Sequence, residues 1–283
     1  MRHKVGHLRT TGRLRRRAWL ALRVVLLAAI LLLGFGYHEA TRDPIVRTAR
    51  FILPDLPPDA GTVRILLMSD MHVQGPDMPP SRLARIVSEA NALQPDIVVL
   101  AGDFTGNNIV ATHRYSEWEA VQPLAALRAK LGVFAVLGNN DRPQGDAATA
   151  VLAGLGIRVL ENRTVQLGPV ALGGFRTRYG TSINRLLKRP PPRIVVSHSP
   201  DGFAVLPPGV DLMLAGHTHC GQIVLPIIGA IATGSEYGSR YLCGITRENG
   251  RTLVVTAGLG TSQVPLRIGA PPDMWLIELA PQH

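Results

Sequence analysis

The chain has 283 residues, of which 46% are hydrophobic, and it contains 29 Gly and 22 Pro. This length and composition allow one large domain or two ordinary ones, and they exclude a largely disordered chain. The formal net charge is +10, but residues 1–23 carry eight basic side chains and no acidic one, which leaves only +2 for the remaining 260 residues. A basic nucleic-acid-binding face on the folded part is therefore not expected, and no nucleic-acid partner is predicted.

The N-terminal region combines a basic tail, residues 1–17, with an apolar stretch, residues 18–37, in which Arg23 is the only charged residue. Twenty residues in a helix span about 30 Å, which is the thickness of the hydrocarbon core of a bilayer. Basic residues that precede a span favour a cytoplasmic N-terminus, so the following residues should lie on the other side of the membrane. We predict a single-pass signal anchor in the inner (cytoplasmic) membrane, with a basic cytoplasmic tail and an extracytoplasmic domain.

Two alternatives for this N-terminal region remain open. Arg16 and Arg17 loosely resemble a twin-arginine motif, so the segment could be a cleaved export signal, although no A-x-A cleavage site follows the apolar stretch. A helix lying in the membrane interface would instead leave the domain on the cytoplasmic face.

The rest of the chain is expected to form a proline-containing linker, residues 38–60, and one monomeric domain, residues 61–283. Short apolar runs in this domain are typical of buried strands: 62–69, 96–101, 132–137, 193–197, 210–215, 252–257 and 274–279, with several short strands over 157–173. Helical patterns lie between them, from about residue 81, near 116–130 and over 146–155. Apolar strands that alternate with helices predict an α/β architecture with buried sheets.

Five of the predicted strands are followed by residues that can bind a metal. These residues are Asp70 with His72, Asp103, Asn139, His198, and His217 with His219. Each motif alone is compatible with an ordinary turn or a core histidine, although Gly-His-Thr-His has few structural uses. Because ligands collect at the carboxyl ends of strands in α/β sheets, the set as a whole indicates a shared site. Mixed imidazole and carboxylate ligands suit divalent Mn, Fe, Zn or Co.

The ordered motifs Asp-x-His, Gly-Asp, Gly-Asn-x-Asp, His and Gly-His-x-His resemble the calcineurin-like metallophosphoesterase superfamily over residues 62–279. Finer features such as 197–201 (SHSPD) and 216–222 (GHTHCGQ) resemble a bacterial membrane-associated phosphodiesterase subgroup. The resemblance implies a four-layer α/β/β/α sandwich and two divalent metal ions, with Mn, Fe or Zn as candidates. It implies that Asp70, His72 and His219 bind one ion, that Asn139, His198 and His217 bind the other, and that Asp103 bridges them.

The chain departs from the family pattern at Asn140, where the motif normally has a histidine that stabilises the transition state or protonates the leaving oxygen. An amide donates a hydrogen bond but is no proton donor near neutral pH, so Asn140 is expected to act in catalysis, with Asp103, only as a hydrogen-bonding group. Leaving groups of low pKa would be least affected. His113 could take over the missing role, although a surface histidine is the simpler interpretation.

Other side chains are open to two interpretations. Arg176 is a candidate for contact with a substrate phosphate, as are three further arginines, and for each the alternative is a solvated surface residue: Arg178, Arg240 and Arg267. Cys220 could form a bridge with Cys243 in an oxidising compartment or be a small packing residue, and packing is the preferred interpretation.

These observations predict a two-metal hydrolase that cleaves a phosphodiester or pyrophosphate bond by metal-bound hydroxide, on a membrane-associated lipid or envelope substrate. One alternative, implied by the subgroup resemblance, is a UDP-2,3-diacylglucosamine-type pyrophosphate hydrolase that faces the cytoplasm. Another is a catalytically weakened metal-binding protein. A nuclease of the same fold is disfavoured because the folded part carries so little positive charge.

Overall fold

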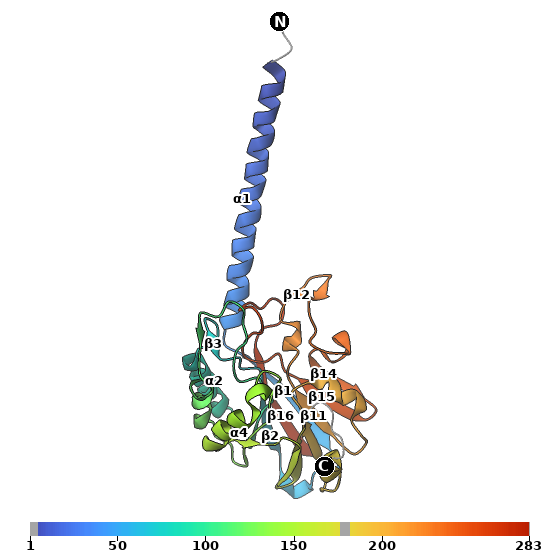
Figure 1. Ribbon diagram of the computed structural model, residues 1–283. Coiled ribbons are helices and arrows are strands. Elements are labelled where there is room, and N and C mark those ends of the chain that lie inside the picture. Colours follow the sequence, from blue (N-terminus) through green and yellow to red (C-terminus); the bar gives the residue numbers. More distant parts are fainter. Residues whose placement is uncertain (1–4, 176–181, 283) are drawn as a thin grey trace.

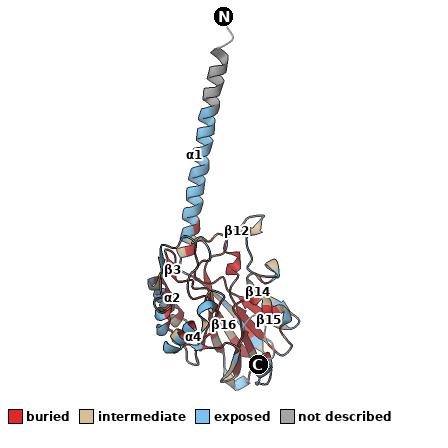
Figure 2. Ribbon diagram, in the orientation of Figure 1, coloured by how far each residue is buried: buried red, intermediate tan, exposed pale blue. Residues whose placement is uncertain are grey.

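The computed structural model describes residues 5–175 and 182–282 (Figure 1). Helix α1, Val5–Thr41, extends away from a two-sheet domain. Within it, Arg15–Thr41 is the one stretch of the described chain that is long and apolar enough to cross a membrane, and the predicted span 18–37 lies inside this stretch. Figure 2 shows that the side chains of α1 whose burial is described, from Arg15 on, are exposed until the helix reaches the domain.

The base of α1 is packed against the domain. Gly36 and Ala40 are buried, and the carbonyl oxygen of Gly36 accepts a hydrogen bond of 2.9 Å from the backbone N–H of Arg267. The hydroxyl of Tyr37 donates to the carbonyl oxygen of Pro76 at 3.2 Å. The helix therefore leaves the domain from a defined place rather than through a free tether.

The segment expected to be a linker, residues 38–60, is instead part of the fold. It contains strand β1, Ile45–Leu53, which pairs in parallel with β16, Asp273–Pro281, over its whole length. The exposure of its side chains alternates along the strand, which suits an edge strand with one solvated face. Pro44 and Pro54 lie just outside β1, so their missing N–H groups remove no hydrogen bond from its pairing with β16.

Two six-stranded mixed sheets form the centre of the domain. The first has the order β1-β16-β2-β4-β6-β7, in which the further strands are β2 (Val63–Met68), β4 (Ile97–Leu100), β6 (Gly132–Ala135) and β7 (Arg158–Val159). The second has the order β14-β15-β11-β10-β9-β8, built from β8 (Arg163–Leu167), β9 (Val170–Gly174), β10 (Arg193–Val196), β11 (Leu212–Ala215), β14 (Gly244–Glu248) and β15 (Arg251–Val255). Because β2, β4 and β6 are parallel, as are β10 and β11, their carboxyl ends meet at one edge of each sheet.

Helices cover the outer face of each sheet. The first sheet is covered by α2 (Pro80–Ala92), α3 (Glu117–Val121) and α4 (Gly145–Gly154), and the second by α5 (Ile183–Leu187) and the 3-10 helix η5 (Pro200–Val205). Successive side chains of β2 point to opposite faces of the first sheet and show the layering. Leu66 packs against the hydrophobic residues of α2, and Leu67 packs in the core between the two sheets. The four-layer α/β/β/α sandwich is thus confirmed.

The helix expected near 116–130 is interrupted. It divides into α3 and the 3-10 helix η2, Gln122–Ala126, since Pro123 lacks the N–H that a continuing α-helix would need. The remaining elements are short. They are η1 (Pro58–Ala60), η3 (Arg142–Gln144), η6 (His219–Gly221), η7 (Gly238–Tyr241), the two-stranded antiparallel sheet of β3 (Gln74–Gly75) with β5 (His113–Arg114), and the hairpin β12–β13 (Val224–Leu225 with Gly229–Ala230).

Candidate metal centre

The carboxyl ends of five strands bring the predicted ligands together. Two groups of side chains have potential ligand atoms within 4.8 Å of one another, namely Asp70, His72 and His219 in one group and Asp103, His198 and His217 in the other. Asn139, the seventh predicted ligand, places its Oδ1 atom 3.1 Å from His198 Nε2. The first sheet supplies the carboxylates, one histidine and the amide, and the second sheet supplies the other three histidines.

Asp103 belongs to the second group and also contacts the first. Its Oδ2 atom is 3.5 Å from His72 Nε2 and 3.4 Å from His198 Nε2. A single carboxylate in contact with both groups is the arrangement needed to bridge two ions about 3.5–4 Å apart. The geometry therefore fits the bridging role that the family resemblance implies.

The donor atoms point at one another in a way that fits bound cations. His72 Nε2 is 3.1 Å from His219 Nε2, and His217 Nδ1 is 3.0 Å from His198 Nε2. Asp70 Oδ1 is buried and has no hydrogen-bond partner among the residues that the structure describes, although His219 Nε2 lies 3.4 Å away. Converging nitrogen and oxygen lone pairs in a buried site are costly unless protons or cations lie between them, and this donor set suits divalent Mn, Fe or Zn.

The backbone at these ligands adopts a conformation that non-glycine residues rarely use. Five ligands have φ between 44° and 71°: Asp70, His72, Asp103, His217 and His219. Left-handed backbone at such residues costs free energy and is concentrated at functional sites. Packing of the rest of the domain therefore maintains a strained backbone at these residues, and this backbone directs their side chains toward the metal site.

Glycines next to the ligands allow the loops to approach closely. A Cβ atom on Gly138 would overlap with the carboxylate of Asp103, and one on Gly216 would overlap with the carboxylate of Asp70. The glycines of the Gly-Asn and Gly-His motifs are therefore needed for packing of backbone against ligand side chains.

His198 is oriented by the first sheet. Its Nδ1 atom lies 2.7 Å from the carbonyl oxygen of Ala101, so the ring donates there and directs Nε2 toward Asp103 and Asn139. A hydrogen bond on the far nitrogen is the usual way of fixing a metal-binding imidazole. Burial lowers the pKa of His198, but the charge and hydrogen bond of Asp103 outweigh it and raise the pKa to about 9. Metal binding at this ring would therefore release a proton.

Arg267 occupies a different place from the one expected. It was predicted to be a solvated surface arginine or a phosphate contact, but it is fully buried. Its guanidinium donates to the carbonyl oxygens of Ala257, Gly260 and Ala270, and its Nη2 atom lies 3.3 Å from His219 Nδ1. Burial lowers the pKa of His219 to about 3, with the neighbouring His72 and Arg267 acting in the same direction, so this ring is neutral and able to bind a cation.

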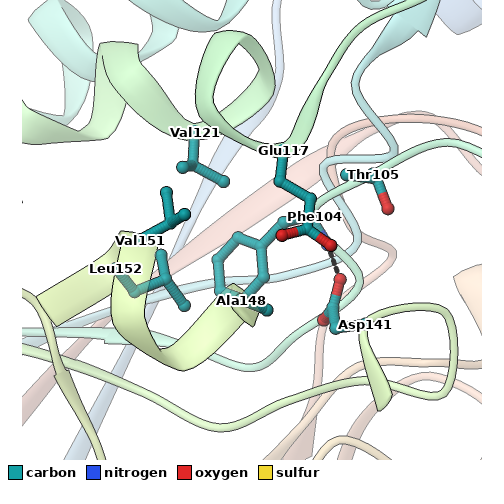
Figure 3. A pocket seen from close by; sticks show the side chains of 8 residues that line it. All are labelled: Phe104, Thr105, Glu117, Val121, Asp141, Ala148, Val151 and Leu152. Carbon is teal, nitrogen blue, oxygen red and sulfur yellow. Dashed lines mark hydrogen bonds between the residues drawn. The ribbon is translucent and has the colours of Figure 1, made fainter. Parts of the chain in front are cut away.

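Asp141 supports the Asp103 loop, a role that was not expected from the sequence. Its carboxylate accepts hydrogen bonds from the backbone N–H groups of Asp103 (2.7 Å), Phe104 (2.9 Å) and Gly138 (2.9 Å). Burial raises its pKa, as does the charge of Asp103. Asp141 also lines a small cavity of about 10 Å³, together with Phe104 and the α4 residue Leu152. Figure 3 shows these side chains. The Gly-Asn-x-Asp spacing is the signal that could have identified this residue.

Asn140 faces the bridging carboxylate. Its side-chain Nδ2 donates to Asp103 Oδ2 at 2.8 Å, and its backbone N–H donates to Asp103 Oδ1 at 2.9 Å. Asn140 also belongs to the polar hollow, a space of about 450 Å³ lined by Val73, Gln74, Thr105, Gly106, Asn107, Arg114, Tyr115, Glu117, Asn140 and Gln144. His113 is exposed with its ring against Tyr115, and it is the neighbouring Arg114 that lines the hollow.

A second space adjoins the other side chains of the centre. This apolar groove has a volume of about 240 Å³ and is lined by His217, Thr218, His219, Gly221, Gln222, Ile223, Ile231, Ala232, Gly234, Ser262, Gln263 and Val264. Cys220 and Cys243 form a disulfide beside it, so the preferred interpretation of Cys220 as an unpaired packing residue is wrong and the alternative, a bridge, holds. The bridge joins the loop of His219 to the start of β14 and thereby holds one wall of the groove.

Of the three other candidate arginines, the structure describes Arg240 alone. Arg176 and Arg178 lie outside the described residues. Arg240 is exposed and forms an ion pair of 2.8 Å with Glu248, so its interpretation as a surface residue fits.

The strand ends of the two facing sheets supply two ligand groups and a shared carboxylate. This arrangement is a candidate binuclear metal site on an α/β/β/α sandwich. The profile of the Calcineurin-like phosphoesterase family matches residues 63–221, more than half of the chain, and the chain belongs to this family.

Its relatives include membrane proteins and a named phosphodiesterase. A "Transmembrane protein with metallophosphoesterase domain" from Danio rerio is 29% identical over 90% of this chain and 61% of the relative. An "Uncharacterized metallophosphoesterase" from Helicobacter pylori (strain J99 / ATCC 700824) is 29% identical over 89% of this chain and 69% of the relative. "Phosphodiesterase YaeI" from Escherichia coli (strain K12) is 28% identical over 87% of this chain and 93% of the relative. The chain thus spans less than two thirds of the Danio rerio relative.

Proposed function

We propose that this chain is a membrane-tethered, metal-dependent phosphodiesterase that cleaves a phosphodiester or pyrophosphate bond in a lipid or envelope molecule. The single observation that carries the proposal is the contact of Asp103 with both ligand groups. Membership of the family and the similarity to a phosphodiesterase support it.

The seven ligands would hold two divalent ions, with Asp70, His72 and His219 on one side of Asp103 and Asn139, His198 and His217 on the other. When bound, two such ions lower the pKa of a water molecule and neutralise phosphoryl oxygens. The chain's own contribution is to hold these ligands in place with the buried Arg267 and Asp141. Because both groups act on one phosphoryl group, removal of the shared carboxylate should affect all substrates alike.

The position of Asn140 bears on the choice of substrate. Its amide is hydrogen-bonded to Asp103, so it orients this carboxylate but has no ionisable proton to give to a leaving oxygen. A leaving group that departs without protonation, such as a phosphate released from a pyrophosphate link, is therefore favoured over an alkoxide.

The location of the domain is part of the proposal. The basic tail before α1 favours a cytoplasmic N-terminus, and the Cys220–Cys243 bridge supports an oxidising compartment on the other side of the membrane. Both observations favour an extracytoplasmic domain and disfavour the alternative of a cytoplasmic hydrolase of UDP-2,3-diacylglucosamine. Protease accessibility of the domain in intact spheroplasts tests this orientation.

The function is tested by assaying the full chain in detergent after loading with Mn²⁺, Fe²⁺ or Zn²⁺, with matched phosphomonoester, phosphodiester and pyrophosphate substrates. We expect hydrolysis of the diester or the pyrophosphate that chelation abolishes and metal restores. A preparation that retains two ions but hydrolyses none of the substrates would instead support the catalytically weakened metal-binding protein, which the replacement of the family histidine by Asn140 favours.

A further inference from the structure

The tip of the β12–β13 hairpin is apolar where turn chemistry would favour another residue. Ile227 is fully exposed and has a φ of 71°, and the next residue, Ile228, is 75% exposed. A β-branched residue in the left-handed region is strained, and glycine or asparagine would be the stable choice there. The two isoleucines contribute nothing to the core of the domain, so their presence points to a contact outside it.

A second exposed apolar pair lies on a loop attached to the same region. Ile109 is 75% exposed and its neighbour Val110 is 58% exposed. The backbone N–H of Ile109 donates to the carbonyl oxygen of Gln263 at 2.9 Å, and Gln263 lines the apolar groove. Ile223 and Ile231, which flank the β12–β13 hairpin, also line the groove, so both loops are joined to its walls.

The segment 262–267 connects these loops to the base of α1. The carbonyl oxygens of Ser262 and Val264 accept hydrogen bonds from Gln222 Nε2 in the groove, at 2.9 and 3.1 Å. A few residues later, the side chain of Leu266 lies against Gly36 of α1. Figure 1 shows α1 leaving the domain on the side where the β12 hairpin projects. The groove, the apolar tips and the end of the membrane helix thus belong to one face.

We propose that Ile109, Val110, Ile227 and Ile228 insert into the headgroup region of the bilayer that α1 crosses, so that the apolar groove beside His217 and His219 opens at the membrane surface. Transfer of apolar side chains at loop tips from water to this boundary lowers the free energy. The same transfer offsets the backbone strain at Ile227. The groove then accepts the apolar part of a lipid phosphoester while its phosphoryl group reaches the metal ligands. This proposal rests on the proposed function and names the bilayer lipid as the class of substrate.

The membrane contact is tested without reference to catalysis, with the full chain in phospholipid nanodiscs. In a Trp19→Phe background, Ile228→Trp reports on the hairpin tip and Ile52→Trp is the matched control, since Ile52 is 52% exposed near the far end of β1. Brominated phospholipids should quench the added fluorescence of Ile228→Trp and leave that of Ile52→Trp unchanged. Equal quenching of both, or of neither, would overturn the proposal.

The delivery of substrate is tested with Ile227→Asn/Ile228→Asn, a variant whose new residues suit the turn, and with Ile52→Thr as control. Hydrolysis of a p-nitrophenyl phospholipid diester embedded in the nanodisc should fall about tenfold in the double variant, while hydrolysis of soluble bis(p-nitrophenyl) phosphate stays unchanged. Equal rates on the embedded diester for the variant and the parent chain would contradict the proposal. If quenching is observed but the parent chain hydrolyses neither ester, the membrane contact stands and the proposed function fails.

Discussion

The two spaces that adjoin the candidate metal centre differ in the side chains that line them. The polar hollow beside Asn140 is lined mainly by amides and charged residues, including Gln74, Arg114 and Glu117. The apolar groove beside His217 and His219 is lined by aliphatic residues such as Ile231 and Val264. Both adjoin the same ligand cluster, so a substrate phosphoryl group bound there has a polar environment on one side and an apolar one on the other.

This difference fits an amphiphilic substrate. Amide and charged side chains can hydrogen-bond to a headgroup, whereas an aliphatic groove lowers the free energy of an acyl or prenyl chain by removing it from water. A substrate with two polar ends would leave the groove unused. The comparison therefore predicts that changes in the two spaces affect different parts of the substrate.

The largest effect is expected from Asp103→Asn, since Asp103 contacts both ligand groups. An amide cannot bridge two cations, so kcat/KM should fall by at least about 10³-fold for every substrate, irrespective of headgroup or chain length. Steady-state assays of soluble and lipid diesters measure this. The exposed Asp59→Asn serves as the control and should retain parent activity; a loss confined to lipid substrates would contradict a shared role for Asp103.

Removal of the disulfide should weaken the wall of the groove. The bridge spans a sequence separation of 23 residues. Loss of such a cross-link destabilises the folded state by about 3 kcal/mol relative to the unfolded chain. Chemical denaturation of Cys220→Ala/Cys243→Ala measures the free energy of unfolding, and an unchanged midpoint would show that the bridge does not stabilise this region. Metal content should be retained, because neither cysteine belongs to the ligand groups.

On the polar side, Asn140→His should supply the missing proton donor. Turnover of an alkyl phosphodiester should rise by roughly 10²-fold, because its leaving oxygen needs protonation, while p-nitrophenyl esters should change little. The ratio of the two rates is the measurement. Equal gains, or none on the alkyl ester, would show that Asn140 is not the position that limits protonation.

The smallest expected effect concerns the length of the substrate's apolar chain. Ile231→Ser removes apolar surface from the groove and should raise KM for a long-chain lipid diester about tenfold, with kcat nearly unchanged. A diester with short chains should respond little. Gln144→Ala in the polar hollow is the matched variant, and its effect should not depend on chain length; the same dependence in both variants would remove the distinction between the two spaces.

The sequence predicted the ends of the central strands well, because each apolar run is followed directly by a polar ligand. Asp70, Asp103 and His198 follow β2, β4 and β10 as expected. Their common edge follows from the rule that parallel strands end together. The division into two sheets was available only through the family resemblance.

Other features depend on contacts between distant segments, which local patterns do not contain. β1 was missed because its sequence, flanked by prolines, does not alternate strictly between polar and apolar residues, and its strand conformation depends on pairing with the distant β16. The burial of Arg267 depends on several backbone carbonyl groups that converge around it. The left-handed backbone at the ligands was likewise not predicted, because an aspartate or histidine in the sequence does not by itself indicate a positive φ.

Anomalous X-ray scattering from crystals of the full chain loaded with Mn²⁺ is the most direct test of the central claim that Asp103 joins two metal sites. We expect two peaks about 3.5–4 Å apart, both within bonding distance of the Asp103 carboxylate. A single peak, or two peaks of which only one contacts Asp103, would contradict the account.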